Sequence, residues 1–235
     1  MEEIHFRYRF KRSDGTEKDF DLVLDQETLR LVPHQKGSVP PWTELTHQQC
    51  PNCPLETTQH KYCPVAFNLS EVIDFFQQSI SYEEVEVTIE TKERSYFKKT
   101  PLQKGISSLL GIYMVTSGCP VLDKLKPLAR FHLPFASLEE TQYRVLSMYL
   151  LAQYFLKKRG KEPDWDLKEL PKIYDEIRIV NKAFCERLKS LKGEDAVPNA
   201  VIILNNFAEA ISFAVSKDAL RRMEKIFSAY LEETR

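Results

Sequence analysis

Four of the five cysteines in this 235-residue chain are each followed directly by proline, and this pattern is the strongest constraint on how the chain folds. Cys50 and Cys53 form a Cys-x-x-Cys pair, Cys63 follows after nine intervening residues, and Cys119 after another fifty-five. A Cys-x-x-Cys pair directs two thiolates at one centre, and two further thiolates complete a shell that suits zinc or an iron–sulfur cluster. We therefore predict one site built by Cys50, Cys53, Cys63 and Cys119.

The prolines give this prediction a physical basis, because proline is favoured at the first position of a helix. The apolar residues that follow Cys63-Pro64 and Cys119-Pro120 recur at helical spacing. Cys63 and Cys119 are thus expected at helix N-termini, where the helix dipole stabilises negative charge and lowers the pKa of a thiol.

The spacing slightly favours an iron–sulfur cluster, such as 4Fe–4S, over structural Zn²⁺. Structural zinc sites usually come as two close pairs of ligands, and this chain has one pair, whereas three clustered cysteines and one distant cysteine also occur in iron–sulfur proteins. Without a metal, the same residues would be a redox disulfide or ordinary buried thiols. His47 and His60 flank the motif and could replace a cysteine ligand, although surface histidines are the simpler interpretation.

Two further alternatives concern single motifs. Cys50-Pro-Asn-Cys53 is similar to the Cys-Pro-x-Cys of glutaredoxins, but Pro54 and a polar run follow it where a helix should open. Arg130 and His132, a dozen residues beyond Cys119, could face a pocket at the cluster as anion binder or proton donor, or could have structural roles only. Cys185 lies on a helical pattern and is expected to be a small core residue.

The composition excludes several classes of function. The chain has 33 basic and 34 acidic residues, which argues against a nucleic-acid-binding protein, and its seven glycines form no phosphate-binding motif. The N-terminus lacks the apolar segment of a signal peptide, and no apolar run is long enough to span a membrane. We therefore expect a cytoplasmic protein without membrane contact. In such a reducing compartment, clustered cysteines favour metal ligation or redox chemistry over structural disulfides.

The hydrophobic pattern predicts an α+β fold. Residues 3–12 alternate as a half-buried strand, Asp14-Gly15 marks a turn, and residues 20–24 continue an antiparallel hairpin, with basic side chains on one strand and acidic ones on the other. Leu29 and Leu31 suggest a third short strand, and residues 85–89 and 95–98 a further pair. Residues 33–62 have no regular pattern, so a metal would have to order them. Helices are expected at 64–79 and from Pro101.

The character of the chain changes at Ser137, which forms a capping box with Glu140. Long apolar helical patterns follow and predict an antiparallel α-helical bundle. We therefore predict a small antiparallel sheet with helices and a four-cysteine metal or cluster site in an α+β domain over 1–136, followed by a bundle domain over 137–235. The helical half is the expected surface for a protein partner or a second copy of the chain.

Four motifs together resemble an uncharacterised family of bacterial proteins that is classed as a domain of unknown function. They are Cys-x-x-Cys-Pro, Cys63-Pro-Val-Ala, Ser117-Gly-Cys-Pro and Phe131-His-Leu-Pro-Phe. The resemblance covers most of the chain and implies no activity. Three functions remain open: a regulatory, sensory or electron-transfer protein with a metal centre, an enzyme that uses the centre with His132 or Arg130, and a zinc-stapled interaction module. The sequence supplies no complete nucleophile and base pair, which favours the first.

Overall fold

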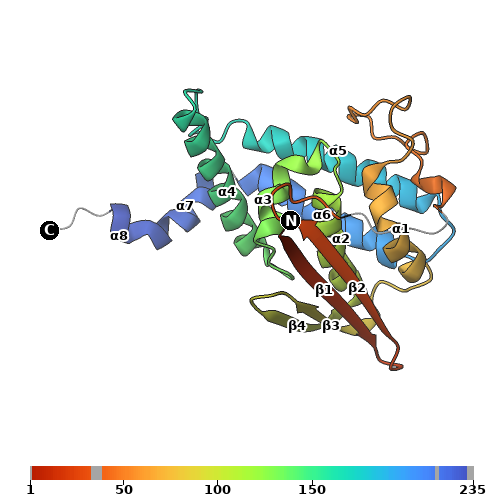
Figure 1. Cartoon of the computed structure of the whole chain (residues 1–235). Coiled ribbons are helices and arrows are strands. Elements are labelled where there is room, and N and C mark those ends of the chain that lie inside the picture. Colours follow the sequence, from red (N-terminus) through yellow and green to blue (C-terminus); the bar gives the residue numbers. More distant parts are fainter. Residues whose placement is uncertain (1, 33–38, 215–216, 232–235) are drawn as a thin grey trace. The chain divides into compact units, whose positions relative to one another are not determined.

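The computed structural model describes residues 2–32, 39–214 and 217–231 and has the predicted α+β composition (Figure 1). The strands are β1 (Glu3–Arg12), β2 (Glu17–Asp25), β3 (Glu84–Glu90) and β4 (Ser95–Pro101). The helices and 3₁₀ turns are η1 (Pro41–Thr43), α1 (Pro64–Phe76), α2 (Leu102–Thr116), η2 (Leu122–Leu125), α3 (Lys126–Arg130), α4 (Leu138–Lys158), α5 (Leu170–Lys189), α6 (Ala196–Ala214), α7 (Lys217–Glu224), η3 (Lys225–Phe227) and α8 (Ser228–Leu231).

The strands form one antiparallel sheet in the order β2-β1-β3-β4. The predicted hairpin is confirmed, and its register places Arg7 opposite Asp21 and Arg9 opposite Asp19. Both pairs are ion pairs, with Nε to Oδ1 distances of 2.8 and 2.9 Å. The predicted third strand at Leu29 and Leu31 is instead a single bridge between Leu24 and Leu31, made where residues 26–28 turn the chain back beside β2.

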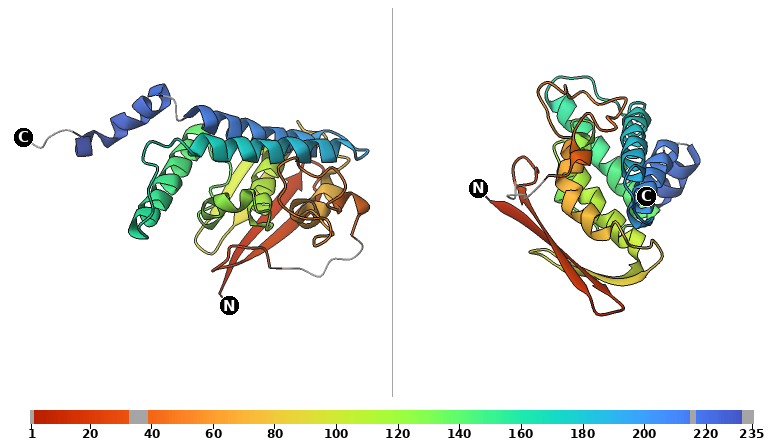
Figure 2. Two further views of the ribbon diagram at one scale, coloured as in Figure 1. Left: turned by 90° about the horizontal axis from the view of Figure 1, so that it is seen from above. Right: turned by 90° about the vertical axis from the view of Figure 1, so that its right-hand side faces the viewer.

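Helices α1 and α2 cover one face of the sheet (Figure 2). Alternate residues of β1, β2 and β3 point toward these helices and are buried. The Phe10 ring on β1 lies 5.0 Å from the Phe76 ring of α1. Helix α2 crosses the sheet at Gly105, where an added Cβ would stand 2.9 Å from side-chain carbons of Phe10 and Val87. The close approach at Gly105 fixes α2, and therefore the position of the Cys119 segment that follows it.

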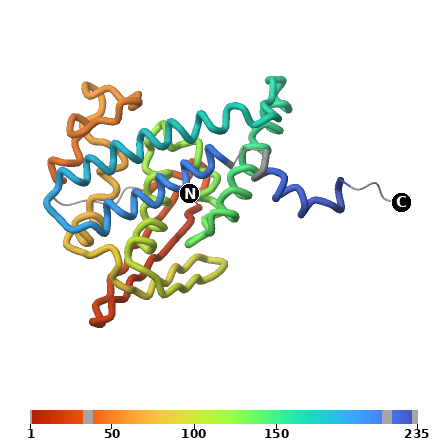
Figure 3. The backbone as a smooth tube through the Cα atoms, turned by 180° about the vertical axis from the view of Figure 1, so that it is seen from behind, coloured from red at the N-terminus to blue at the C-terminus, as the bar shows by residue number. Residues whose placement is uncertain are grey.

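The chain divides into two compact units, Met1–Phe135 with Ile179–Asn205, and Ala136–Arg178 with Asn206–Arg235. The first unit includes the segment 179–205, so neither unit is one continuous stretch of the chain. The domains expected at 1–136 and 137–235 stay a prediction. Within the first unit the ends of α5 and α6 lie side by side (Figure 3), and Cys185 Sγ is 4.0 Å from the carbonyl oxygen of Pro198.

The predicted capping box at the start of α4 is present, since Glu140 N donates to Ser137 Oγ at 3.2 Å and Ser137 N donates to Glu140 Oε2 at 2.7 Å. Helix α6 differs from the sequence-based expectation in one respect. Its window Ala196–Phe213 has a mean hydropathy of 1.2 and is long and apolar enough to cross a membrane by length and composition alone. Core helices meet the same criterion, so this window is weak evidence for a membrane span.

Candidate metal centre

Cys50 and Cys53 lie in a closed loop, residues 43–63, which we call the cysteine loop. Its two ends pair as short antiparallel segments: Cys63 N donates to Thr43 O at 2.9 Å, and Leu45 N donates to Lys61 O at 2.8 Å. Inside the loop, Cys53 N donates to Cys50 O at 3.0 Å, which makes the Cys-x-x-Cys turn. These hydrogen bonds hold the turn on the same loop as Cys63. Of the irregular stretch predicted at 33–62, residues 33–38 lie outside the described residues.

Cys63 is the N-cap of α1, as the sequence predicted. Its backbone is extended, Pro64 occupies the first turn, and Phe67 N donates to Cys63 O at 2.8 Å. Its side chain accepts no capping hydrogen bond from the helix. The thiol of Cys63 is therefore not used as a helix cap.

Cys119 lies in the turn after α2, and here the prediction of a helix beginning at Pro120 was wrong. Gly118 adopts a φ of +93°, which glycine accommodates without the steric cost of a side chain, and the chain reverses there. Leu122 N and Asp123 N both donate to Cys119 O at 3.1 Å, and the 3₁₀ turn η2 begins only at Leu122. The residues predicted to begin a helix at Pro120 thus form a turn that leads into η2.

Asn68 connects the segments that carry Cys63 and Cys119. Its side-chain amide donates to the carbonyl oxygen of Pro64 at 2.8 Å and to that of Ser117 at 3.3 Å. Pro64 is adjacent to Cys63, and Ser117 is two residues before Cys119. One side chain in α1 therefore connects the start of this helix, at the end of the cysteine loop, with the segment that leads to Cys119.

The pKa values of Cys50 and Cys119 are both raised, mainly by burial. Burial raises the pKa of Cys50 to about 12, the charges of Cys63, Cys119 and Cys53 also raise it, and Arg187 lowers it. Burial likewise raises the pKa of Cys119 to about 11; hydrogen bonds from Leu122 and Val121 lower it, and Cys63 and Cys53 raise it.

For Cys119 this corrects the predicted lowering of the thiol pKa, because the cost of burying a thiolate exceeds the stabilisation by backbone N–H groups. All five cysteines are free thiols. Among the residues that the structure describes, no three His, Cys, Asp or Glu side chains are grouped as the shell of a single metal ion.

Arg187 is a functional candidate that sequence reasoning missed. It lies on α5, its side chain is only 1% exposed, and its guanidinium donates to the carbonyl oxygens of Trp42, Glu44 and Gln48. The available signal was its position: Arg187 follows Val180 and Phe184 at helical spacing and thus falls on the buried face of the helix.

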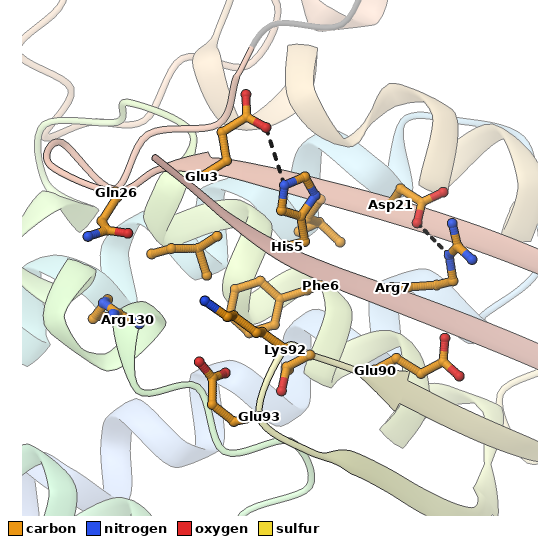
Figure 4. A pocket seen from close by; sticks show the side chains of 13 residues that line it. Glu3, His5, Phe6, Arg7, Asp21, Gln26, Glu90, Lys92, Glu93 and Arg130 are labelled. Atoms are coloured by element: carbon orange, nitrogen blue, oxygen red, sulfur yellow. Dashed lines mark hydrogen bonds and ion pairs between the residues drawn. The ribbon is translucent and has the colours of Figure 1, made fainter. Parts of the chain in front are cut away.

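Arg130 and His132 are not placed with the cysteines. Arg130 lines a pocket of about 420 Å³ at the end of β1, together with Glu3, His5 and Lys92 (Figure 4), and none of its described lining residues is a cysteine. His132 Nε2 is hydrogen-bonded to Tyr8 Oη, and burial raises the pKa of Tyr8. The pocket at Arg130 therefore differs from the predicted pocket at the cluster.

The two histidines that flank the motif have different surroundings. His47 Nε2 is hydrogen-bonded to Ser190 Oγ at 2.9 Å, and His60 is exposed on the outer part of the cysteine loop. Cys185 is buried in α5, and burial raises the pKa of its thiol. Lys189 lowers this pKa and Glu186 raises it. His60 is thus a surface residue and Cys185 a core residue, whereas His47 is half-buried.

The fold is α+β, with Cys50, Cys53 and Cys63 on the cysteine loop and Cys119 in the turn after α2. A family described as a domain of unknown function, DUF6901, matches residues 4–228. The chain belongs to this family, which confirms the resemblance to an uncharacterised family. Comparisons with curated proteins and with solved structures found no match.

Proposed function

We propose that this chain is a non-catalytic metal-binding protein in which Cys50, Cys53, Cys63 and Cys119 bind one iron–sulfur cluster. The carrying observation is the bridge made by Asn68, which ties the turn of Cys119 to the start of α1. The antiparallel pairing at the base of the cysteine loop holds Cys50, Cys53 and Cys63 on one loop. The charges of the other thiols contribute to the raised pKa values of Cys50 and Cys119, which supports the same grouping.

An iron–sulfur cluster is favoured over Zn²⁺ by the arrangement of the ligands. Three cysteines lie on one loop and the fourth follows a separate helix, an arrangement that iron–sulfur proteins use. The buried Arg187 beside the loop also suits a centre whose four thiolates leave it negatively charged. We infer a regulatory, sensory or electron-transfer role in a reducing compartment such as the cytoplasm, where free thiols persist.

Anaerobic purification tests this function. A brown protein with visible charge-transfer absorbance, and with iron and acid-labile sulfide in equal amounts, is the expected result. A colourless protein that retains stoichiometric zinc would indicate a structural zinc site instead of a cluster. That result would favour the interaction module. A protein that binds neither metal after anaerobic reconstitution would refute the metal-binding function.

The enzyme alternative has less support. His132 is engaged with Tyr8, which also contacts Ser108 Oγ at 3.0 Å, so a structural role explains its placement. Arg130 belongs to the pocket at the end of β1, and its cation lies 5.7 Å from the centre of the Phe131 ring. The predicted contact with a partner protein or a second copy through the helical half stays a prediction.

A further inference from the structure

We propose that the pocket at the end of β1 binds the C-terminal end of an extended peptide from a partner protein. The backbone of the peptide pairs with Glu3 and His5 on a free edge of β1. Its terminal carboxylate lies at Lys92 and Arg130. None of these residues belongs to the cysteine loop, so peptide binding does not depend on the proposed metal centre.

The first residues of β1 have a strand on one side only. β1 pairs with β2 from Glu3 onward, but it pairs with β3 only from Arg7 onward. β3 ends at Glu90, opposite Arg7, and the chain then turns into β4. Residues 3–6 therefore form a short open edge, and such an edge is a template for another extended chain.

Hydrogen bonds around this edge show which of its backbone groups are open. Glu2 O accepts from Gln26 N at 3.1 Å, so Glu2 faces the side of β2. Successive residues of an antiparallel strand direct their N–H and C=O groups alternately to opposite sides. Glu3 and His5 thus face away from β2, and Val23, opposite His5, likewise directs its carbonyl oxygen away from β1. Two N–H donors and two carbonyl acceptors face the side where no described strand lies.

The open edge suits the end of a chain better than its middle. A segment beside residues 3–6 meets β3 at Glu90, which already pairs with Arg7, so the segment cannot continue along the sheet. The pocket has a volume of about 420 Å³, which accommodates only a few residues. A C-terminus that reaches the blocked end runs parallel to β1 and comes close to the turn that carries Lys92.

The charges in the pocket favour a carboxylate at this end. Lys92 points toward Arg130 of α3, and Glu93 lies beside them (Figure 4). Among the described residues, no ion pair neutralises either cation. The Arg130 guanidinium lies 5.7 Å from the centre of the Phe131 ring, a contact that leaves its charge uncompensated. Glu93 offsets one of the two cations, so one positive charge remains for a charge-assisted hydrogen bond to a carboxylate.

The other charged residues of the pocket are engaged with one another. Arg7 Nε lies 2.8 Å from Asp21 Oδ1, and His5 Nε2 lies 3.2 Å from Glu3 Oε2. Glu90 lies on the same side of the pocket as Arg7 (Figure 4), and its charge acts on that guanidinium. The uncompensated positive charge is thus confined to the turn after β3 and to α3.

Ile4 and Phe6 determine which last residue the peptide should carry. Both line the pocket from the helix-facing side of β1, where Phe6 is buried and Ile4 is half-buried. A residue of an added strand that lies beside them projects to the same side of the sheet. We therefore expect an apolar residue at the C-terminus of the peptide, because it loses water contact beside Ile4.

The test follows the backbone amides of Glu3 and His5 by NMR in the full-length protein. The probe is a pool of acetylated pentapeptides that alternate apolar residues (valine, leucine, isoleucine or phenylalanine) with threonine and end on an apolar residue with a free carboxylate. A second pool is amidated at the C-terminus, and a third is N-methylated at its last three backbone nitrogens. The variants are Arg130→Gln and Lys92→Gln. Their control is Lys99→Gln, which breaks an exposed ion pair with Glu84 outside the pocket.

The free-carboxylate pool should shift both amides in a saturable way. The amidated pool, and either pocket variant with the free-carboxylate pool, should bind at least about tenfold more weakly, because charge-assisted hydrogen bonds are lost. The N-methylated pool should also bind more weakly, and Lys99→Gln should match the native protein. Should Arg130→Gln fail to fold, the exposed Lys92→Gln decides the role of the cations.

Different results overturn each part. Unchanged amides of Glu3 and His5 in the free-carboxylate pool refute peptide binding. Equal affinity of the amidated pool, or of the pocket variants and Lys99→Gln, excludes carboxylate recognition, and equal affinity of the N-methylated pool excludes pairing with the edge. If sodium acetate alone reproduces the shifts, the pocket is an anion site only. If the shifts appear without peptide as the protein concentration rises, a second copy of the chain occupies the edge instead.

Discussion

The side-chain amide of Asn68 donates a hydrogen bond to the carbonyl oxygen of Ser117, forty-nine residues later in the chain. Asn68→Asp replaces this donor by an acceptor and places a negative charge beside two carbonyl oxygens. We expect the unfolding free energy to fall by about 1–3 kcal/mol, since two partly buried carbonyl oxygens lose their donor. Metal content should also fall, because Cys119 is no longer held next to α1.

Asn199→Ala is the matched control for Asn68→Asp. Its amide donates to Asp195 Oδ2 at 2.9 Å on the surface, so a loss below about 1 kcal/mol and unchanged metal content are expected. Thermal unfolding and metal analysis are the measurements. Equal metal content in both variants would count against Asn68 as the link between the two segments.

The second prediction separates the four proposed ligands from the fifth cysteine. Single substitutions of Cys50, Cys53, Cys63 or Cys119 by serine should each lower metal content and loosen the cysteine loop, because metal binding and folding are coupled. Cys185→Ala should leave metal content unchanged and cost only the small cavity left in the core. Loss of metal from Cys185→Ala would show that a ligand has been misassigned.

The third prediction uses two glycines of α2 as a matched pair. Gly105→Ala places a methyl group 2.9 Å from side-chain carbons of Phe10 and Val87, which should destabilise the protein by about 1–3 kcal/mol. Gly111→Ala meets only Leu204 Cδ2, at 3.5 Å, which is ordinary contact. It should stabilise the helix by about 0.5–1 kcal/mol, because alanine loses less backbone entropy. Denaturant unfolding of both variants measures the difference, and effects of the same sign would contradict the close approach of α2 to the sheet.

The fourth prediction concerns pH and Asp195, which precedes α6. Hydrogen bonds from the backbone N–H and hydroxyl of Ser81 and from Asn199 lower the pKa of Asp195, against the opposing effect of burial. A lowered folded-state pKa means that the stabilisation is present above the unfolded pKa, about 4, and is lost as pH falls through the folded value.

Asp195→Asn should therefore be less stable than the native protein at neutral pH, by less than about 1 kcal/mol because water screens this exposed group. The difference should shrink as the pH falls below about 4. Unfolding free energies at several pH values between about 6 and 3 test this. A difference that stays constant over the whole range would exclude a role for the ionised carboxylate.

The local features of the fold could be predicted from the sequence. Alternation of apolar residues defines β1 and β2, the charges of Arg7 and Arg9 match those of Asp21 and Asp19, and Ser137 with Glu140 marks the start of α4. Pro64 likewise marks the start of α1 at Cys63. Each of these signals acts over a few residues or across one tight turn, which is why it is readable in a single sequence.

The remaining features depend on contacts between distant segments. The pairing of β1 with β3, the grouping of 179–205 with the N-terminal unit and the hydrogen bonds of Arg187 have no local periodicity. The turn at Cys119 was misread because proline after cysteine suits both a helix start and a turn, and the φ of Gly118 decides between them. The candidate ligands were accessible from their shared proline context, but Arg187, far along the chain, was not.

The hydrogen bond from Arg187 to Trp42 spans 145 residues, and this separation has a consequence for synthesis on the ribosome. The Cys-x-x-Cys turn leaves the ribosome early, whereas its arginine emerges only when most of the chain has been made. Domains fold as their segments emerge, N-terminal parts first. For most of its translation the nascent chain therefore carries the cysteine loop without its hydrogen bonds from Arg187. Under the proposed function, the loop would reach its final conformation for metal binding only at the end of synthesis or in the released protein.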